Sequence, residues 1–569
     1  MCRYNHWYVS VLEANGEVLL ENEDSKRKLN PFDDCINTNK TIENKILLGK
    51  YCLSSTNFES YNFLHFNKFS LSNGTCVPDE CTISDIITIF NSTRITFWTT
   101  DTLCQTKEVE PYDRIALATI AFFGVLFSVV IASSLYDAIL HYLHEEPAHY
   151  LLTSFSLLTN GKKILQVDNS QSFDQISCMN GIRVISLILI IILHTFITSI
   201  QFIQNISYYQ EWCQSIYGTF LIGGFFSVDT FLVLTGLLIS FNAMKLITRK
   251  QKFHVIKYYI NRYFRISSVF FVSVLISLSL IHLSSGPLWK ANAQYHQFAC
   301  STNWWNTLLY IENIMNMETM CIGISWYLCL DVQLCIISPI LIIPLKTKPK
   351  IVLMFSALLG IFSIISVFGL VWFYRGVSEE IYQFKIYTHS LVKASPWFFG
   401  LITGYYLFIS KKSKLKINKI WANILSTMSI IGFIICIYEN KFYTFDDEHI
   451  LENSFRLIII HSLFSLCVCW FVYACDNGYF KLINKFLSLP VFEILSKLSY
   501  SAFIIHYMVL NFIVFSWKRP IIFSAFERLI YSFWNIVITM VFALIATLTI
   551  EMPVVTIIKF LLSKKIKKS

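Results

Sequence analysis

Apolar runs of about 20 residues, repeated along most of the chain, constrain its fold more than any other feature. Each run is close to the length that an α-helix needs to cross the hydrocarbon core of a bilayer. Only 15% of the residues are charged, whereas a soluble protein carries about a quarter. The sequence therefore predicts an all-α polytopic membrane protein with about eleven transmembrane helices. Their expected limits are 114–135, 182–203, 216–241, 266–283, 324–345, 351–373, 395–410, 421–438, 456–475, 498–516 and 529–550.

The loops between these runs alternate in charge. If the N-terminal region lies outside, an odd number of spans places the C-terminus inside, and the loops then predicted inside hold the clusters of Lys and Arg. This is the positive-inside asymmetry of membrane proteins. It predicts an extracellular or lumenal N-terminal domain and a cytosolic C-terminus, in the plasma membrane or the endoplasmic reticulum. The net charge of +9 resides largely in these loops and does not indicate binding to nucleic acid.

Residues 1–112 are polar and rich in cysteine, which predicts a small disulfide-rich domain from an oxidising compartment. The alternative is a set of scattered free thiols, and the sequence does not choose among the many connectivities. No leader precedes this domain, so we expect either that the chain lacks its first residues or that the first apolar run acts as the signal. The cysteines of this region are Cys2, Cys35, Cys52, Cys76, Cys81 and Cys104.

Two further features agree with this orientation. Four sequons for N-glycosylation fall in the N-terminal region or in a loop predicted outside, and they begin at Asn39, Asn73, Asn91 and Asn205. Cys300 and Cys321 flank another loop predicted outside and can pair with each other. The other cysteines mostly lie in apolar runs, where cysteine usually behaves as a small hydrophobe.

The apolar helix expected around 180–200 carries two ionisable side chains, Arg183 and His194. They are eleven residues apart, which is about three helical turns, so both lie on one face, separated by about 16 Å along the axis. Such groups are costly in a bilayer unless they have partners or a function. With the predicted orientation, Arg183 lies near the cytosolic end and His194 lies deeper.

This pattern has a chemical interpretation. An imidazole such as His194 can take a proton from a hydroxyl near neutral pH, and a carboxylate such as Asp229 or Asp331 can orient it. Arg183, with Arg262 and Arg265, suits a phosphate-bearing donor such as a nucleotide-containing thioester. No P-loop, HExxH motif or paired CxxC occurs in the sequence, and no metal is expected.

The polar residues within the apolar runs, and the arginines beside them, also have a purely structural interpretation. Asp229, Gln333 and Glu551 can hold helices together through hydrogen bonds. The Arg262 and Arg265 pair can simply set topology. His506, which lies within another apolar run, is slightly better explained as a satisfied core histidine.

Several distinct motifs follow one another along the chain. They are Asn180-Gly-Ile-Arg-Val with His194-Thr, Ser227-Val-Asp-Thr-Phe-Leu-Val-Leu-Thr-Gly236, Gly286-Pro-Leu-Trp289, Ser325-Trp-Tyr-Leu with Asp331-Val-Gln333, and Lys497-Leu-Ser-Tyr with His506. These motifs resemble membrane acyltransferase family 3, and more narrowly its animal branch, the nose resistant to fluoxetine proteins. In the N-terminal region, Leu48-Leu-Gly-Lys-Tyr-Cys52 and Gly74-Thr-Cys-Val-Pro-Asp-Glu-Cys81 resemble the cysteine-rich lumenal domain of that branch.

The resemblance implies a ten-helix acyltransferase bundle preceded by one extra span. Arg183 and His194 match the Arg-x10-His signature of the family, and Arg262 and Arg265 match its arginine pair. The chain departs from the family where Ile266-Ser-Ser268 replaces a frequent proline and where Lys393 stands in place of a frequent arginine. The implied divisions are a lumenal domain over 1–112, a first transmembrane helix over 113–135, a cytosolic linker over 136–174, an acyltransferase domain over 175–555 and a basic cytosolic tail over 556–569.

Three functions remain open on the sequence. The first is transfer of an acyl group, such as acetyl, from acyl-CoA to a hydroxyl of a lipid, a sugar or another small acceptor, with membrane lipids around the protein. The second is a non-catalytic transporter or a lipid- and drug-handling protein on the same scaffold, because buried polar groups suit a substrate path equally well. The third is a receptor whose glycosylated domain binds a partner. The sequence names neither the acceptor nor a protein partner.

Overall fold

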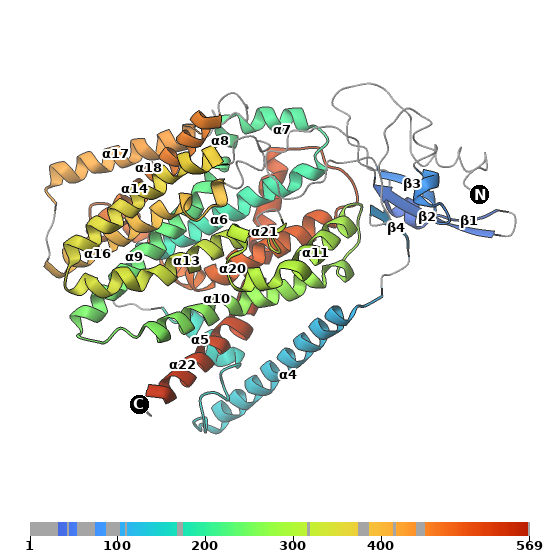
Figure 1. Ribbon diagram of the computed structural model, residues 1–569. Coiled ribbons are helices and arrows are strands. Elements are labelled where there is room, and N and C mark those ends of the chain that lie inside the picture. Colours follow the sequence, from blue (N-terminus) through green and yellow to red (C-terminus); the bar gives the residue numbers. More distant parts are fainter. Residues whose placement is uncertain are drawn as a thin grey trace.

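The computed structural model describes residues 32–42, 45–53, 74–86, 103–107, 111–167, 175–315, 319–373, 386–413, 417–439 and 450–566. A small sheet domain lies at one end of a large bundle of helices, and a long helix, α4, stands at the side of the bundle (Figure 1). This arrangement confirms the expected polytopic helical fold with a disulfide-rich N-terminal domain.

The N-terminal domain is an antiparallel sheet in the order β1-β2-β3, with β4 paired to β2. Disulfides join Cys35 to Cys76 and Cys52 to Cys104, and Cys81 is bonded to a cysteine outside the described residues. Closing loops of 41 and 52 residues stabilises such a domain by about 4 kcal/mol for each bridge in the chain-entropy account. The elements are α2 (Phe32–Ile36), β1 (Asn39–Ile42), β2 (Lys45–Leu53), β3 (Gly74–Pro78) and β4 (Cys104–Gln105).

This domain is docked on the helix ends through polar and apolar contacts. The side-chain amide of Gln105 donates to the carbonyl oxygens of Gly286 and Pro287, each at 3.1 Å. Lys518 Nζ lies 3.4 Å from an Asp33 carboxylate oxygen. An apolar cluster shared by the two parts includes Phe32, Tyr51, Phe202, Trp289 and Phe515. The Gly286-Pro-Leu-Trp289 stretch therefore serves as the platform for the N-terminal domain.

Eleven long helices coincide with the eleven expected spans. Among the described residues, nine segments are long and apolar enough to cross a membrane. The other two expected spans are α10 and α16, which lie inside the same bundle (Figure 1). The eleven helices are α4 (Arg114–Leu143), α6 (Cys178–Ser199), α9 (Phe226–Thr248), α10 (Val255–Leu278), α13 (Ser325–Ile342), α14 (Pro349–Phe373), α16 (Ser395–Ser413), α17 (Lys419–Glu439), α18 (Ile450–Asp476), α20 (Pro490–Phe515) and α21 (Ala525–Ala546).

Other elements connect these helices. The remaining helices are α5 (Leu157–Leu165), α7 (Ile206–Cys213), α8 (Ile216–Ile222), α11 (Trp289–Leu308), α12 (Glu312–Met315), α19 (Lys481–Leu487) and α22 (Met552–Ile566), of which α11 is as long as some of the spans but was not expected to be one. The 3₁₀ turns are Ile200–Phe202, Gly223–Phe225, Leu280–His282, Ile343–Lys346 and Val392–Ala394, and a π-helical turn, Thr547–Glu551, joins α21 to α22.

One predicted boundary was wrong, and the expected division of the basic tail stays a prediction. Helix α10 begins at Val255, not at 266, so Arg262 and Arg265 lie in its first turns and not in a loop. The segment contains neither proline nor glycine, and its Tyr258 side chain turns into the bundle, where Tyr258 Oη lies 2.9 Å from Ser338 Oγ. The segment expected to be a basic tail is helical from Met552 to Ile566.

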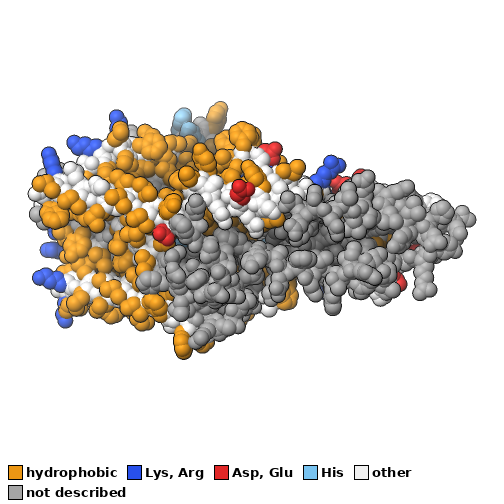
Figure 2. Space-filling view, turned by 90° about the horizontal axis from the view of Figure 1, so that it is seen from above, with side chains coloured by type: hydrophobic (Ala, Val, Ile, Leu, Met, Phe, Trp, Pro, Cys, Tyr) orange, Lys and Arg blue, Asp and Glu red, His pale blue; other side chains and the backbone are white. Residues whose placement is uncertain are grey.

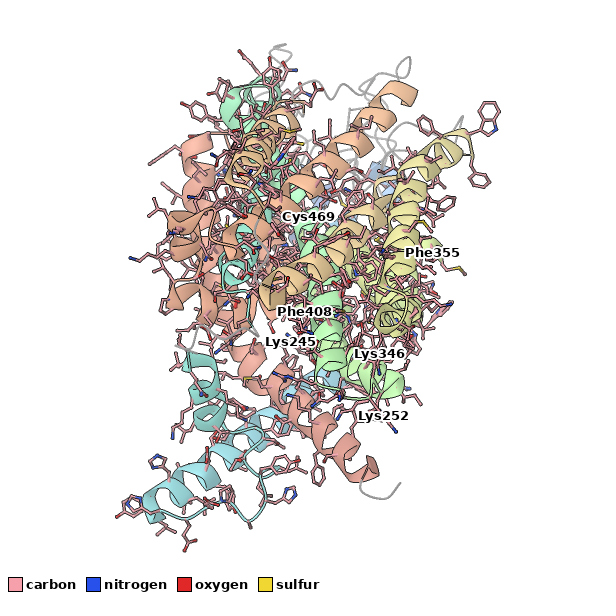
Figure 3. All side chains as sticks on the ribbon, turned by 90° about the vertical axis from the view of Figure 1, so that its left-hand side faces the viewer. Lys245, Lys252, Lys346, Phe355, Phe408 and Cys469 are labelled. Carbon is pink, nitrogen blue, oxygen red and sulfur yellow. A yellow bond between two sulfur atoms is a disulfide. The ribbon has the colours of Figure 1, made fainter. Side chains whose placement is uncertain are left out.

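Basic side chains gather at the end of the bundle that faces away from the N-terminal domain (Figure 2). The visible flank of the bundle is largely apolar, as expected for a surface that contacts lipid. Lys245, Lys252 and Lys346 lie near one another at the basic end (Figure 3), where α9 contacts the 3₁₀ turn that ends in Lys346. This distribution supports the predicted orientation, which stays a prediction.

Helices α9 and α16 approach each other so closely that only glycine fits at the crossing. A Cβ on Gly400 would lie 2.1 Å from the Val233 carbonyl oxygen, and one on Gly404 would lie 2.2 Å from that of Leu237. Gly236 meets the Trp397 carbonyl oxygen in the same way, at 2.1 Å. Small residues spaced four apart are the usual means of bringing membrane helices into such contact.

We predict that Gly404→Leu lowers the melting temperature of the purified protein in detergent, because the added atoms have no space without helix separation. Overpacking of this kind costs about 1–3 kcal/mol or more. Gly124→Leu is the control, since nothing lies within 4 Å of a Cβ at that position in α4. Equal melting temperatures for the two variants would show that the helices separate freely.

A buried carboxyl lies beside the disulfide Cys300–Cys321, whose predicted pairing is confirmed. Glu312 accepts hydrogen bonds from the backbone N–H of Cys321 and from the Ser325 hydroxyl, the latter at 2.6 Å. Burial outweighs these bonds and raises the pKa of Glu312 from 4.5 to about 7. The loop that precedes α13 therefore packs over a carboxyl group whose protonated form is favoured.

We predict that this carboxyl makes the fold less stable as the pH rises from about 4.5 to 7. The unfolded carboxyl ionises first, so stability present below pH 4.5 is lost as the pH rises through the folded pKa of about 7. The loss is about 3 kcal/mol. Thermal unfolding between pH 4.5 and 8 should show a smaller decrease for Glu312→Gln than for the wild type, with the exposed Glu527→Gln as control. Parallel curves would contradict the prediction.

Candidate functional site

Two histidines meet in the interior of the bundle. His194, on α6, places its Nδ1 atom 2.8 Å from Nε2 of His506, on α20. Their rings are nearly parallel, at 3°. His506 is fully buried, whereas His194 is only half-buried. The two helices pack against each other along their length, which holds the rings in this register.

The hydrogen bonds fix which nitrogen carries each proton. Nδ1 of His506 lies 2.6 Å from the Phe503 carbonyl oxygen, which can only accept, so this nitrogen is protonated. No carboxylate contacts either ring among the described residues, and buried imidazoles without such a partner are favoured in the neutral form. His506 Nε2 then accepts from Nδ1–H of His194. The remaining nitrogen, Nε2 of His194, keeps its lone pair and can take a proton.

A second group of charges lies toward the basic end of the bundle. Arg262 Nη2 contacts both carboxylate oxygens of Asp331, at 2.8 and 2.7 Å. Arg265 Nε lies 3.3 Å from Glu551 Oε1, and the Arg265 side chain is 61% exposed. Glu551 also accepts from the Ser501 hydroxyl at 2.8 Å. Both predicted arginines are therefore neutralised in part by acids.

Arg183 differs from these two arginines. It makes no hydrogen bond or ion pair with any described residue, and its charge lies near that of Arg265 and near the Tyr327 hydroxyl. Arg183 is half-buried and lies on the same face of α6 as His194, about three turns nearer the start of the helix. A guanidinium held next to another guanidinium, without its own carboxylate, is suited to an anionic ligand.

The third predicted acid, Asp229, belongs to a separate buried cluster. Its Oδ1 lies 3.3 Å from Lys393 Nζ, and its Oδ2 accepts from Nδ1 of His461. The exposed fractions of the Asp229 and Lys393 side chains are 0% and 3%. Lys393 Nζ also lies 4.0 Å from the centre of the Tyr387 ring. This cluster joins α9, α18 and the turn before α16.

The structure thus changes one part of the sequence-based hypothesis. Neither Asp229 nor Asp331 contacts His194, because each is committed to a cation on another helix. The partner of His194 is His506, which sequence reasoning interpreted as a core histidine. The available signal was that both histidines fall within apolar runs, but nothing in the sequence pairs α6 with α20.

The predicted glycosylation sites are placed unevenly. Asn39 lies in β1 and is exposed. Asn205 is half-buried, and its side-chain amide bonds to the backbone of Phe523 through both its nitrogen and its oxygen. A glycan on Asn205 would have to disrupt this pairing. Asn73 and Asn91 both lie outside the described residues. In the part of the chain that the structure describes, no cluster of side chains is suited to a metal ion.

Comparison with known proteins identifies one matching family and several relatives. Residues 176–554 match the family described as an acyltransferase domain. "Nose resistant to fluoxetine protein 6" of Caenorhabditis elegans is 24% identical over 80% of this chain and 59% of its own length. A Staphylococcus aureus (strain COL) protein with the provisional name of O-acetyltransferase is 24% identical over 52% of this chain and 47% of its own.

A third relative, "Regulator of hypoxia-inducible factor 1" of Caenorhabditis elegans, is 23% identical over 60% of this chain and 70% of its own length. The chain therefore spans only about half to three fifths of the first two relatives. No solved structure matches. The expected resemblance to the nose resistant to fluoxetine proteins is confirmed.

We predict that the Asp229 cluster is a coupled structural unit. Lys393→Met should lower the stability of the purified protein by about 3–5 kcal/mol, because it leaves a buried carboxylate short of a cation. Combining it with Asp229→Asn should restore most of this loss, whereas the exposed Lys252→Met should have little effect. Thermal unfolding in detergent measures the wild type, these variants and Asp229→Asn alone, and strictly additive losses would show that the two groups are not coupled.

Proposed function

The chain belongs to the membrane acyltransferase family that matches residues 176–554, and on this premise we propose that it transfers an acyl group from acyl-CoA to a hydroxyl of a small or lipid acceptor. The observation that carries the proposal is the histidine pair inside the bundle, with one free, basic nitrogen. The provisional name of the staphylococcal relative agrees with this class of reaction.

His194 is the proposed general base. Its Nε2 takes the proton of the acceptor hydroxyl while the hydroxyl oxygen attacks the thioester carbonyl carbon. The new C–O bond forms as the C–S bond breaks, and the departing thiolate receives the proton from the imidazolium. His506 positions this base, since its bond to Nδ1 keeps the reactive lone pair on Nε2. It also stabilises the imidazolium when it forms.

Arg183 and Arg265 are the proposed contacts of the donor phosphates. Arg183 makes no ion pair among the described residues, and Arg265 is exposed enough to meet a ligand from the basic end of the bundle. His194 lies about 16 Å further along the axis of α6. A donor whose phosphates are separated from its thioester by an extended arm matches this arrangement.

The orientation follows from the same proposal. If the basic end faces the cytosol, acyl-CoA enters from the compartment that contains it, and the N-terminal domain lies in the lumen or outside the cell. The acceptor then meets His194 from the side of the bundle that carries the N-terminal domain.

The alternative is a transporter or lipid-handling protein without chemistry. It is favoured by one observation, the buried Asp229, Lys393 and His461 cluster, which this reaction does not use. Buried ionisable groups of this kind also line substrate and proton paths in membrane proteins.

We predict that His194→Ala lowers transfer or hydrolysis of labelled acetyl-CoA by the purified protein by about 10²–10⁴-fold. His506→Leu should cause a similar loss, and His506→Gln a smaller one, because a glutamine oxygen can still accept the bond from His194. His141→Ala, an exposed histidine on α4, is the control. Turnover that survives both the His194→Ala and the His506→Leu substitution would reject the proposed base and its partner.

A further inference from the structure

A buried arginine that the proposed reaction does not use lies at the end of the bundle near the N-terminal domain. Arg528, in the first turn of α21, has only 1% of its surface exposed. Its Nε and Nη1 atoms are buried and have no hydrogen-bond partner. The guanidinium stacks on two rings, with its carbon 4.4 Å from the centre of Tyr531 and 5.2 Å from that of Trp517.

No acid neutralises this guanidinium among the described residues. Glu527 precedes it on the exposed side of α21; its charge acts on the guanidinium, but no hydrogen bond or ion pair joins the two side chains. The nearby Lys518 is already committed to Asp33 and to the Ser285 hydroxyl. A buried cation with unsatisfied donors is costly, whereas elsewhere in this bundle Arg262, Arg265 and Lys393 all have carboxylate partners.

Arg528 begins a polar stripe that reaches the level of the histidine pair along the bundle. The buried face of α21 begins with four polar residues, Arg528, Ser532, Asn535 and Thr539, and ends with Ala543 and Ala546, while the residues between the polar ones are mostly exposed apolar groups. The Asn535 amide donates to the Thr195 hydroxyl at 3.1 Å, and Thr195 follows His194 in α6. Seven residues separate Arg528 from Asn535, so the guanidinium lies about 10 Å from the histidine level along the helix axis.

Arg528 and Arg183 lie on opposite sides of the histidine level. Helix α21 runs antiparallel to α6, and it continues through the π-helical turn to Glu551, the partner of Arg265. Arg183 and Arg528, neither of which has a carboxylate partner among the described residues, therefore lie at levels on either side of His194 along the bundle. One end suits the donor phosphates, which leaves the other for the second substrate.

We propose that Arg528 binds an anionic group, a carboxylate or a phosphate, of the acyl acceptor, whose reacting hydroxyl lies about 10 Å away at His194. This inference rests on the proposed function and narrows its acceptor to anionic molecules. The planar guanidinium supplies the paired donors that such groups accept, and the rings of Trp517 and Tyr531 hold it in place. Because the side chain is buried, a bulk lipid headgroup does not reach it from the membrane surface.

The test compares two probes of equal length, 8-hydroxyoctanoate and 1,8-octanediol, with purified protein in neutral detergent. The first readout is thermal stabilisation, which needs no turnover. We expect a shift with the acid at concentrations at least tenfold below those needed for the diol. Equal shifts for the two probes in the wild type would overturn the proposal, whether or not any variant folds.

Variants then assign the effect to this residue. Arg528→Gln should remove the preference for the acid, Arg528→Lys should keep part of it, and Arg519→Gln, an exposed arginine of the preceding loop, should leave it unchanged. A preference for the acid that persists in Arg528→Gln overturns the proposal. So does stabilisation that requires anionic lipid in nanodiscs and is not produced by 8-hydroxyoctanoate, because the ligand is then a bilayer lipid.

The second readout is acyl transfer from labelled acetyl-CoA to each probe, which separates the two proposals. Arg528→Gln should lower transfer to the acid at least tenfold with no change for the diol. A preference for the acid in the stabilisation readout with no turnover of acetyl-CoA rejects the acyltransferase and leaves an anion site at Arg528. Turnover with equal transfer to both probes rejects the anion site and leaves the acyltransferase.

Discussion

An ionised side chain inside a membrane bundle has to be neutralised, and this constraint decides how the interior of the protein is arranged. Asp331 is held by Arg262, Glu551 by Arg265, and Asp229 by Lys393 and His461. Each pair joins two or three helices that are distant in sequence. The pairs therefore fix the helix order as well as the charges. Against this background, Arg183 and Arg528, which have no carboxylate partner among the described residues, are exceptions that a ligand would explain.

The close packing of α9 and α16 serves the same constraint. The glycines at their crossing let the two backbones approach, and the turn that carries Lys393 comes directly before α16. Asp229 lies in the first turn of α9. A wider separation of the helices would pull Lys393 away from a carboxylate that is fully buried. Loss of a glycine and loss of the lysine should therefore damage the same region for related reasons.

Sequence reasoning reached the features that depend on local pattern. The spans follow from the length of the apolar runs, and the Cys300–Cys321 bridge from two cysteines around one loop. Sequence reasoning missed the features that depend on contacts between distant segments, such as those of His194 with His506 and of Asp229 with His461. Helix α10 was placed too late because its first turns look like a charged loop until Asp331 is known to face Arg262.

The linear order of the site bears on how the proposed reaction would proceed. In the proposed reaction His194 acts as a base, so no covalent acyl intermediate forms on this residue. The donor thioester and the acceptor hydroxyl must then meet at Nε2 of His194 at the same time. Arg183 and Arg528 lie on opposite sides of that atom, so two substrates anchored at the two ends can reach it without competing for one entrance. Direct transfer between two bound substrates is the order of events that this geometry favours.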